Sequence, residues 1–285
     1  MSSTQPKKGS FRPVHAAHSI EQAALVVNFD RPLDYAQLAA VSEITNQFKE
    51  ELPGGGPIQG GFSFMIGGPA GMPVPFTPPQ PSSVTGVLLH RNAPNGAIES
   101  ELRVEQTSMS FRTNVYSRWS AVWKLAHRYF SSVIGTYLDS GANLVNISLN
   151  FADKFVWDGE MKACDPSLLM KNDSKYVAAH IFSRNDLWHI HTGAFDRSDN
   201  QTKRLTNVNI DCLEEVVGFT TQRSIVITTV LTDIFNQPGY DAISLSKVDG
   251  MNFIASHLEA LHSYDKEILR EILAVPIAQQ IALLD

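Results

Sequence analysis

The chain has 285 residues, of which 43% are hydrophobic and 18% are charged, a balance typical of a globular protein with a large core. Its formal net charge of −6 and pI near 5.8 argue against a protein that grips nucleic acid mainly by electrostatics. The two cysteines, Cys164 and Cys212, lie far apart and outside any CxxC spacing, which argues against a disulfide framework or a zinc knuckle.

The N-terminal residues are polar and predict a flexible tail over residues 1–18. Lys7 and Lys8 are not followed by an apolar stretch, so a secretory signal is not expected. No segment approaches the roughly 20 apolar residues of a membrane span. Together with the low cysteine count, these features predict a cytoplasmic protein that does not contact a membrane.

A strand and a helix are predicted next. The short, β-branched run 23–29 is typical of a buried strand. Asp34 and Gln37 have the spacing of a capping box, and the apolar repeat that follows them has helical spacing. We expect this first helix to end before Pro53 and Gly54.

The segment 53–81 contains eight glycines and eight prolines among its 29 residues, a composition that predicts a loop rather than a helix or a central strand. Its apolar side chains are unusual for a solvated linker. We expect them either to pack on the parent domain or to form a docking surface for a protein partner or a second subunit. The candidate partner-contact residues are Phe62, Phe64, Met65, Ile66, Met72 and Phe76.

The clearest apolar stripe at helical spacing predicts a helix over 117–138 that buries Trp119, Trp123 and Val133 against a sheet. Basic residues surround its aromatic side chains, which would suit a platform for single-stranded nucleic acid. Helical phasing places the tryptophans on the apolar stripe, so core packing is the preferred interpretation. The basic residues are Arg112, Arg118, Lys124 and Arg128.

Alternating segments in both halves of the chain predict antiparallel strands, with a turn at Asn95 and Gly96 and a last helix over 249–273. The predicted strands cover residues 86–90, 102–106, 109–112, 146–157, 176–182, 187–195, 205–210 and 224–231.

Strands that come in runs, rather than alternating singly with helices, favour an antiparallel sheet. We therefore predict an α+β fold, with a mainly antiparallel sheet or sheets and two long helices and one shorter N-terminal helix packed on one face. Residues 19–285 are expected to form a single domain, or two interlocked halves at about 19–140 and 141–285.

Scattered stretches of the chain are similar to a known family. They are the opening stretch 20–33, the residues from Val104–Gln106 through Phe111 and Arg112 to Tyr116 and Trp119, the strand 146–150, and the terminal helix around 253–258 and Tyr264. On these residues the chain resembles a sporadically distributed prokaryotic family of uncharacterised proteins of about this length. The Gly/Pro-rich segment 53–81 departs from the family's pattern, and the resemblance implies no catalytic residues.

Three histidines form the clearest candidate site. His189 and His191 are two apart on a predicted strand and therefore share a face. If 176–182 and 187–195 form a hairpin, the register that gathers the apolar side chains on one face places His180 opposite one of the other histidines. Such a group would suit zinc or another divalent metal, and would predict a metal-assisted hydrolase or nuclease. The alternative is a set of ordinary solvent-facing histidines, because no fourth ligand is identifiable.

None of the common motifs for nucleotide binding, metalloprotease or serine hydrolase chemistry occurs in the sequence. This lack, with the sporadic distribution of the resembling family, leads us to expect a non-catalytic binding or interaction protein of a defence or toxin-related locus. We expect a protein partner or self-association rather than nucleic acid, and no cofactor. No small-molecule site is identifiable from the sequence.

Overall fold

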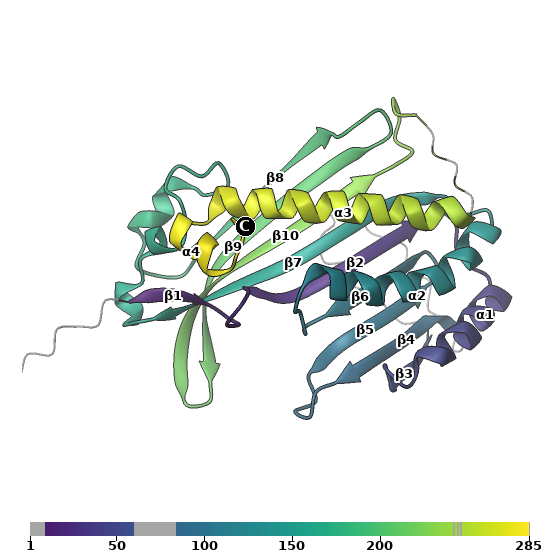
Figure 1. Ribbon diagram of the computed structural model, residues 1–285, viewed down its shortest axis with the longest axis horizontal. Helices are drawn as coiled ribbons and strands as arrows, with labels where there is room; N and C mark the ends of the chain where they lie inside the picture. Colours follow the sequence, from purple (N-terminus) through teal and green to yellow (C-terminus); the bar gives the residue numbers. More distant parts are fainter. Residues whose placement is uncertain (1–8, 60–83, 242, 244, 246, 285) are drawn as a thin grey trace, which may run out of the picture.

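One large antiparallel sheet organises the chain (Figure 1). The computed structural model describes residues 9–59, 84–241, 243, 245 and 247–284. Every strand pair within them is antiparallel, in the order β3-β4-β5-β6-β2-β7-β10-β9-β8, with β1 also paired to β7. The strands are β1 (Ser10–Pro13), β2 (Ile20–Phe29), β3 (Gly54–Gln59), β4 (Val84–Asn92), β5 (Ile98–Glu105), β6 (Ser108–Thr113), β7 (Leu144–Asp158), β8 (Trp188–Arg197), β9 (Lys203–Val217) and β10 (Thr220–Ile234).

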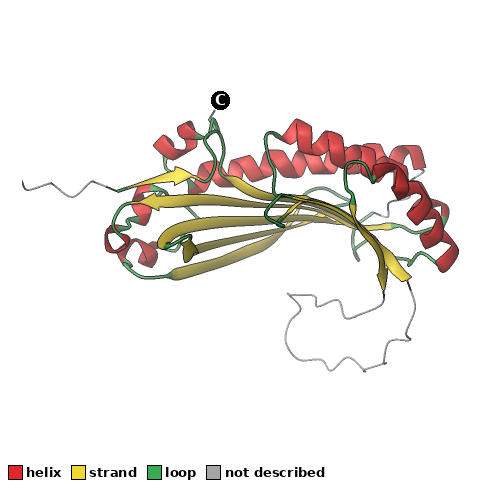
Figure 2. Cartoon of the chain, turned by 90° about the horizontal axis from the view of Figure 1, so that it is seen from below, coloured by secondary structure: helices red, strands yellow, loops and turns green. Residues whose placement is uncertain are grey.

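The described residues contain four α-helices: α1 (Tyr35–Thr45), α2 (Trp119–Asp139), α3 (Lys247–Ile272) and α4 (Val275–Gln280). Three helices were expected, and the short α4 is the addition. α3 ends at Ile272, and Pro276 lies in the first turn of α4, where a proline is well tolerated. In Figure 2 the long helices α2 and α3 lie along the same side of the curved sheet. None of the helices in the described part of the chain is both long and apolar enough to cross a membrane.

The start of α1 confirms the predicted capping box. The Asp34 carboxylate accepts a hydrogen bond from the Gln37 amide, and the Gln37 side chain accepts one from the Asp34 amide, both at 2.8 Å. The helix ends at Thr45, earlier than its apolar repeat implies, and the 3-10 helix η1 (Asn46–Phe48) continues the chain. Leu52 is buried beyond it, so the repeat still marks one apolar face.

Two of the predicted irregular segments contain strands. Residues 10–13, expected in a flexible tail, form β1 and pair with the end of β7. Residues 54–59, expected in the Gly/Pro-rich loop, form β3. This strand lies at the edge of the sheet, where proline and glycine are tolerated because the outer backbone groups have no neighbouring strand to serve. Residues 60–81 lie outside the described residues.

The central strand β7 joins the two halves of the chain in one sheet. On one side it pairs with β10, and on the other with β2 over residues 144–153 and with β1 over residues 155–158. Between β1 and β2, residues 15–18 bulge away from β7, while the Val14 amide and the Ser19 carbonyl still hydrogen-bond to the backbone of Lys154. The register shifts just inside β2. Such an irregularity opens room beside a strand and redirects side chains.

Candidate functional site

The structure does not form the predicted histidine hairpin. His189 and His191 do share the exposed face of β8, but β8 pairs with β9, where they lie opposite Asp211 and Asn209. His180 lies in the 3-10 helix η4 (Ala179–Ser183) and is not across from either histidine. Within the described residues, no group of three or more His, Cys, Asp or Glu side chains is arranged to hold a metal ion.

The reason lies in the segment before β8. Instead of a strand, it forms turns tied to the end of α3, through a bridge between Met170 and Leu273 and a 2.8 Å hydrogen bond from the Lys171 amide to the Ile272 carbonyl. Ile181 is fully buried there. With this segment held elsewhere, β8 pairs with β9, which follows it directly in the chain.

The six candidate partner-contact residues, Phe62, Phe64, Met65, Ile66, Met72 and Phe76, lie outside the described residues.

The helix predicted over 117–138 corresponds to α2, which spans Trp119–Asp139. Val133 is fully buried as predicted, whereas Trp119 and Trp123, near the start of α2, are only half-buried.

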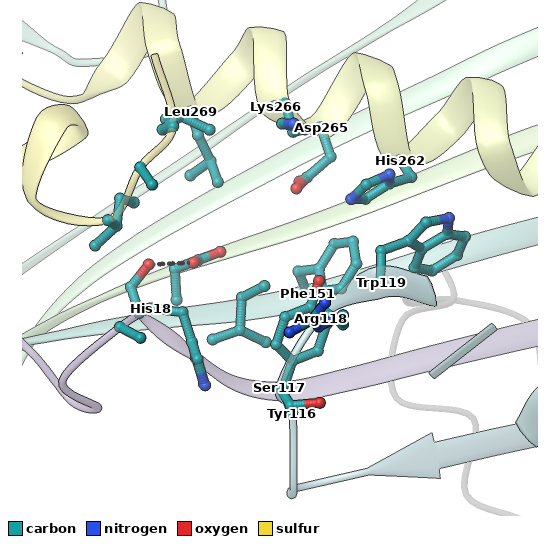
Figure 3. Close-up of a pocket in the computed structure, with 17 residues that line it drawn as sticks. His18, Tyr116, Ser117, Arg118, Trp119, Phe151, His262, Asp265, Lys266 and Leu269 are labelled. Carbon is teal, nitrogen blue, oxygen red and sulfur yellow. Dashed lines mark hydrogen bonds between the residues drawn. The ribbon is translucent and has the colours of Figure 1, made fainter. Parts of the chain in front are cut away.

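A cavity of about 290 Å³ lies at the start of α2 (Figure 3). It is lined by five segments: residues 17–20, residues 116–119 at the start of α2, β7, α3 and residues 281–283. Its polar lining residues are His18, Ser19, Tyr116, Ser117, Arg118, Asp153, His262, Asp265 and Lys266. The sequence did not predict that these segments come together, because most of them are far apart in the chain.

The first carboxyl group of the cavity belongs to Asp153 on β7. Phe151, Asp153 and Phe155 alternate on the buried face of this strand, and Asp153 is 1% exposed. The hydroxyl of Ser19, directly before β2, donates a 2.6 Å hydrogen bond to Asp153 Oδ1. The other carboxylate oxygen, Oδ2, is buried without a hydrogen-bond partner among the described residues. An unpartnered buried acceptor of this kind is costly and calls for a functional explanation.

The second carboxyl group belongs to Asp265 on α3, which is 2% exposed. In Figure 3 it projects from the helix toward the strands. The Thr229 hydroxyl of β10 donates a 2.5 Å hydrogen bond to Asp265 Oδ1. Two acidic side chains, one from the sheet and one from the covering helix, are thus buried in the same wall.

Burial raises the pKa of Asp153 to about 6, with the Ser19 hydrogen bond opposing it. Burial also raises the pKa of Asp265 to about 8, and the negative charge of Asp153 adds to this increase. At neutral pH the two groups therefore share about one proton, which resides mainly on Asp265. Burial and both carboxylates raise the pKa of Tyr116 in the same cavity.

An aromatic pair forms another part of the wall. The Trp119 ring stacks on the His262 ring with centroids 4.5 Å apart and planes 12° apart (Figure 3). The indole N–H of Trp119 donates to Glu259 at 2.6 Å, which fixes the ring orientation. Burial lowers the pKa of His262, so its imidazole is neutral at pH 7. The two rings cover one face of each other, and the pair forms a mainly uncharged aromatic part of the cavity lining.

The basic side chains at the cavity are more exposed than the carboxyl groups. Arg118 is exposed and Lys266 is half-buried. The other basic residues near the aromatic stripe are placed differently: Arg112 pairs with Glu101 at 3.2 Å, and Arg128 pairs with Glu51. Of the four basic residues around the aromatic side chains of α2, Arg118 is the one that lines the cavity.

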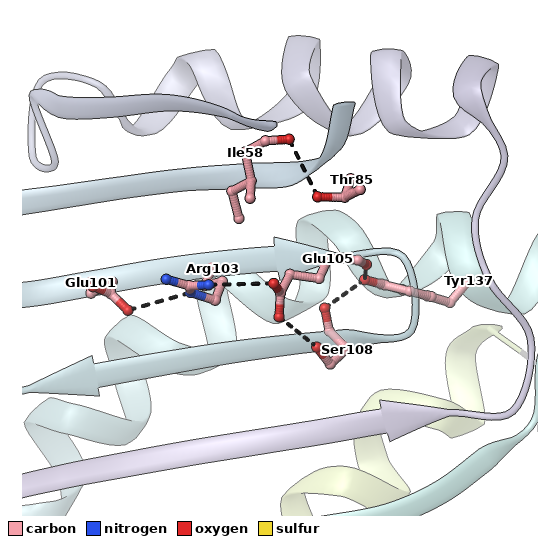
Figure 4. Close-up of polar contacts among 7 residues, drawn as sticks. All are labelled: Ile58, Thr85, Glu101, Arg103, Glu105, Ser108 and Tyr137. Carbon is pink, nitrogen blue, oxygen red and sulfur yellow. Dashed lines mark hydrogen bonds and ion pairs between the residues drawn. The ribbon is translucent and has the colours of Figure 1, made fainter. Parts of the chain in front are cut away.

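The position of α2 is fixed near its C-terminal end by Tyr137 (Figure 4). The fully buried Tyr137 hydroxyl donates to the backbone carbonyls of Glu105 and Ser108, which flank the turn between β5 and β6. Its ring stacks on Phe29 of β2 with centroids 4.0 Å apart. These contacts hold α2 against the sheet. They therefore help to determine the position of Trp119, the first residue of the helix.

A signal for both carboxyl groups is present in the sequence. Asp153 occupies a buried-face position of an alternating strand, and Asp265 occupies a position of the apolar stripe of a helix. A charged residue at such a position is rare unless it is paired or functional.

Comparison with protein-family models and with curated proteins finds no match to this chain. The cavity is therefore interpreted from its own chemistry.

Proposed function

We propose that the chain is a binding protein and that the cavity between β7, α2 and α3 takes a small ligand. The observation that carries the proposal is the buried Asp153 carboxylate, which has an unpartnered oxygen in the cavity wall. A few polar groups that converge on a partly apolar concave site are the usual mark of a small-molecule site. Perturbed carboxyl pKa values in the same wall support the same choice.

Binding is favoured over acid–base catalysis because both carboxyl groups are nearly covered, at 1% and 2% exposure. A general acid or base must come within hydrogen-bond reach of its substrate, whereas a buried charge acts on a ligand through the low-dielectric interior without direct contact. The sequence also suggested a metal-assisted hydrolase or nuclease. The observation behind that hypothesis is missing, because His180 is not opposite His189 or His191.

Other expectations from the sequence belong with this proposal. We propose a cytoplasmic location, which suits two cysteines that are both free. A protein partner or second copy at the Gly/Pro-rich segment 53–81 is a proposal from the sequence, because residues 60–81 lie outside the described residues. Membership of the sporadically distributed prokaryotic family, and a defence or toxin-related role, are likewise proposals that rest on the resemblance.

A thermal-shift screen of metabolites tests the binding proposal. Ser117→Trp places a large side chain at an exposed position of the cavity lining, and Ser131→Trp places the same side chain on an exposed part of α2 outside the lining. A ligand at 100 times its Kd stabilises the folded state by about 2.7 kcal/mol, which gives a melting shift of several degrees.

We expect at least one metabolite to raise the melting temperature of the wild type and of Ser131→Trp, but not that of Ser117→Trp. The proposal is wrong if no compound shifts the wild type. It is also wrong if every compound that does so shifts Ser117→Trp equally.

A further inference from the structure

We infer that the ligand is a small zwitterion of amino-acid size, with its protonated amine toward Asp153 and its acidic group toward Arg118 and Lys266. This inference rests on the proposed binding function and adds the ligand class to it. Three features of the cavity carry it: the separation of charge between its wall and its entrance, an uncapped helix start, and its size.

Charge is separated along the cavity. The acidic side chains Asp153 and Asp265 are nearly inaccessible, whereas the basic Arg118 is exposed and Lys266 is half-buried. No ion pair joins either basic residue to an acidic one among the described residues. A ligand with a positive end inside and a negative end at the entrance satisfies both regions, and a ligand with one charge leaves one region uncompensated.

The start of α2 adds to the positive end of this arrangement. No side chain caps its first turn, and Arg118 occupies the N-cap position. The free amide groups and the helix dipole at such a terminus favour an anion, above all beside an arginine. Residues 116–119 line the cavity, so the acidic group of a ligand is expected here.

The buried carboxylate favours a cation in the interior. Asp153 Oδ2 has no hydrogen-bond donor among the described residues, so its charge is not offset there, and it attracts an ammonium group through the low-dielectric interior without direct contact. Trp119 and His262 stack on each other and both line the cavity, so they form an uncharged aromatic part of the lining beside which the body of the ligand can pack. The volume of about 290 Å³ is at the small end for ligand sites, which suits a molecule of amino-acid size.

A cation in this cavity has a signature that a neutral ligand lacks. Its charge lowers the pKa of Asp265, which holds a proton at neutral pH, and binding therefore releases a proton. The other titratable and charged groups that line the cavity are His18, Tyr116, Arg118, Asp153, His262 and Lys266. His262 is neutral at pH 7 because burial lowers its pKa, so it does not supply that proton.

Isothermal titration calorimetry with the twenty common amino acids tests the inference. The tightest binder is then compared with its amine-only and acid-only analogues, which for phenylalanine are phenethylamine and 3-phenylpropionate. We expect the zwitterion to bind at least tenfold more tightly than either analogue. Repeating the titration at pH 7 in two buffers of different ionisation enthalpy should detect proton release for the zwitterion and the amine, but not for the acid.

Variants assign each end of the ligand. Asp153→Asn keeps the shape and an acceptor for Ser19, and it should reduce the zwitterion's affinity to about that of the acid-only analogue. Arg118→Ala with Lys266→Ala should reduce it to about that of the amine-only analogue. Lys124→Ala removes an exposed charge of α2 outside the cavity lining and is the matched control, for which no change is expected.

The outcomes separate this inference from the binding proposal. If no amino acid binds while other metabolites bind in a way that Ser117→Trp blocks, the zwitterion inference is wrong and the cavity remains a binding site. The same holds if a single-charge analogue binds as tightly as the zwitterion, or if no proton is released. If no compound of any class binds in the cavity, both fail.

Discussion

Asp265 lies on the apolar face of α3, between the buried residues Leu261 and Ile268. Its side chain is buried in the same cavity lining as that of Asp153. Its folded-state pKa of about 8 lies above the ordinary value of 3.8, because burial and the Asp153 charge disfavour ionisation. The folded state therefore holds this proton more tightly than the unfolded state does. The stability linked to it is present below pH 4 and is lost as the pH rises toward 8.

Asp265→Asn removes this dependence while keeping an acceptor for the Thr229 hydroxyl. We expect the variant to be more stable than the wild type above pH 8, on the order of a few kcal/mol, because each tenfold change in proton affinity corresponds to about 1.4 kcal/mol. Urea unfolding at pH 5 and pH 9 measures the difference. The exposed Asp173→Asn is the matched control. Equal stability losses between these pH values in wild type and Asp265→Asn would contradict the assignment.

At the scale of elements, α1 shows what local sequence determines. Its start depends on side chains three residues apart, and both hydrogen bonds of the capping box are present. Asp34→Ala should lower the free energy of unfolding by about 1 kcal/mol, because it leaves first-turn amides without an acceptor. Chemical denaturation measures this loss, with the exposed Glu43→Ala of the same helix as the control. A loss as small as that of the control would show that the cap adds no stability.

Elements that depend on distant contacts were predicted less well. The segment 176–182, expected as a strand, forms turns and the start of the 3-10 helix η4. The turns before it are bonded to the end of α3, about one hundred residues later in the chain. The strand β3 was hidden by a glycine- and proline-rich composition, which an edge position tolerates. Periodicity indicates which face of an element is buried, but it does not identify the partner.

The candidate site was beyond sequence reasoning for the same reason. Asp153 and Asp265 are separated by most of the second half of the chain, and Ser19 and Trp119 come from the first half. The three histidines are close in sequence, which suggests a shared site. In the structure His180 lies in η4, whereas His189 and His191 lie on β8. The sequence does carry one signal of the site: Asp153 and Asp265 are acidic residues at positions where the apolar pattern predicts a buried side chain.

At the scale of the whole molecule, the cavity lies where the two halves of the chain meet. The pairing with β7 is interrupted by a bulge between β1 and β2, and α2 from the first half begins beside the same cavity as α3 from the second. Residues 281–283 close the cavity from the C-terminal side. A ligand in this position would contact segments from both halves, so its binding is expected to stabilise the fold as a unit.

The most direct test of the account is a crystal structure of the protein with the amino acid that binds most tightly in calorimetry. The account predicts ligand density in the cavity, against the Trp119 ring, with the amine on the side of Asp153 and the carboxylate at Arg118 and the first turn of α2. Density at another place on the molecule, or an empty cavity at a saturating ligand concentration, would contradict it.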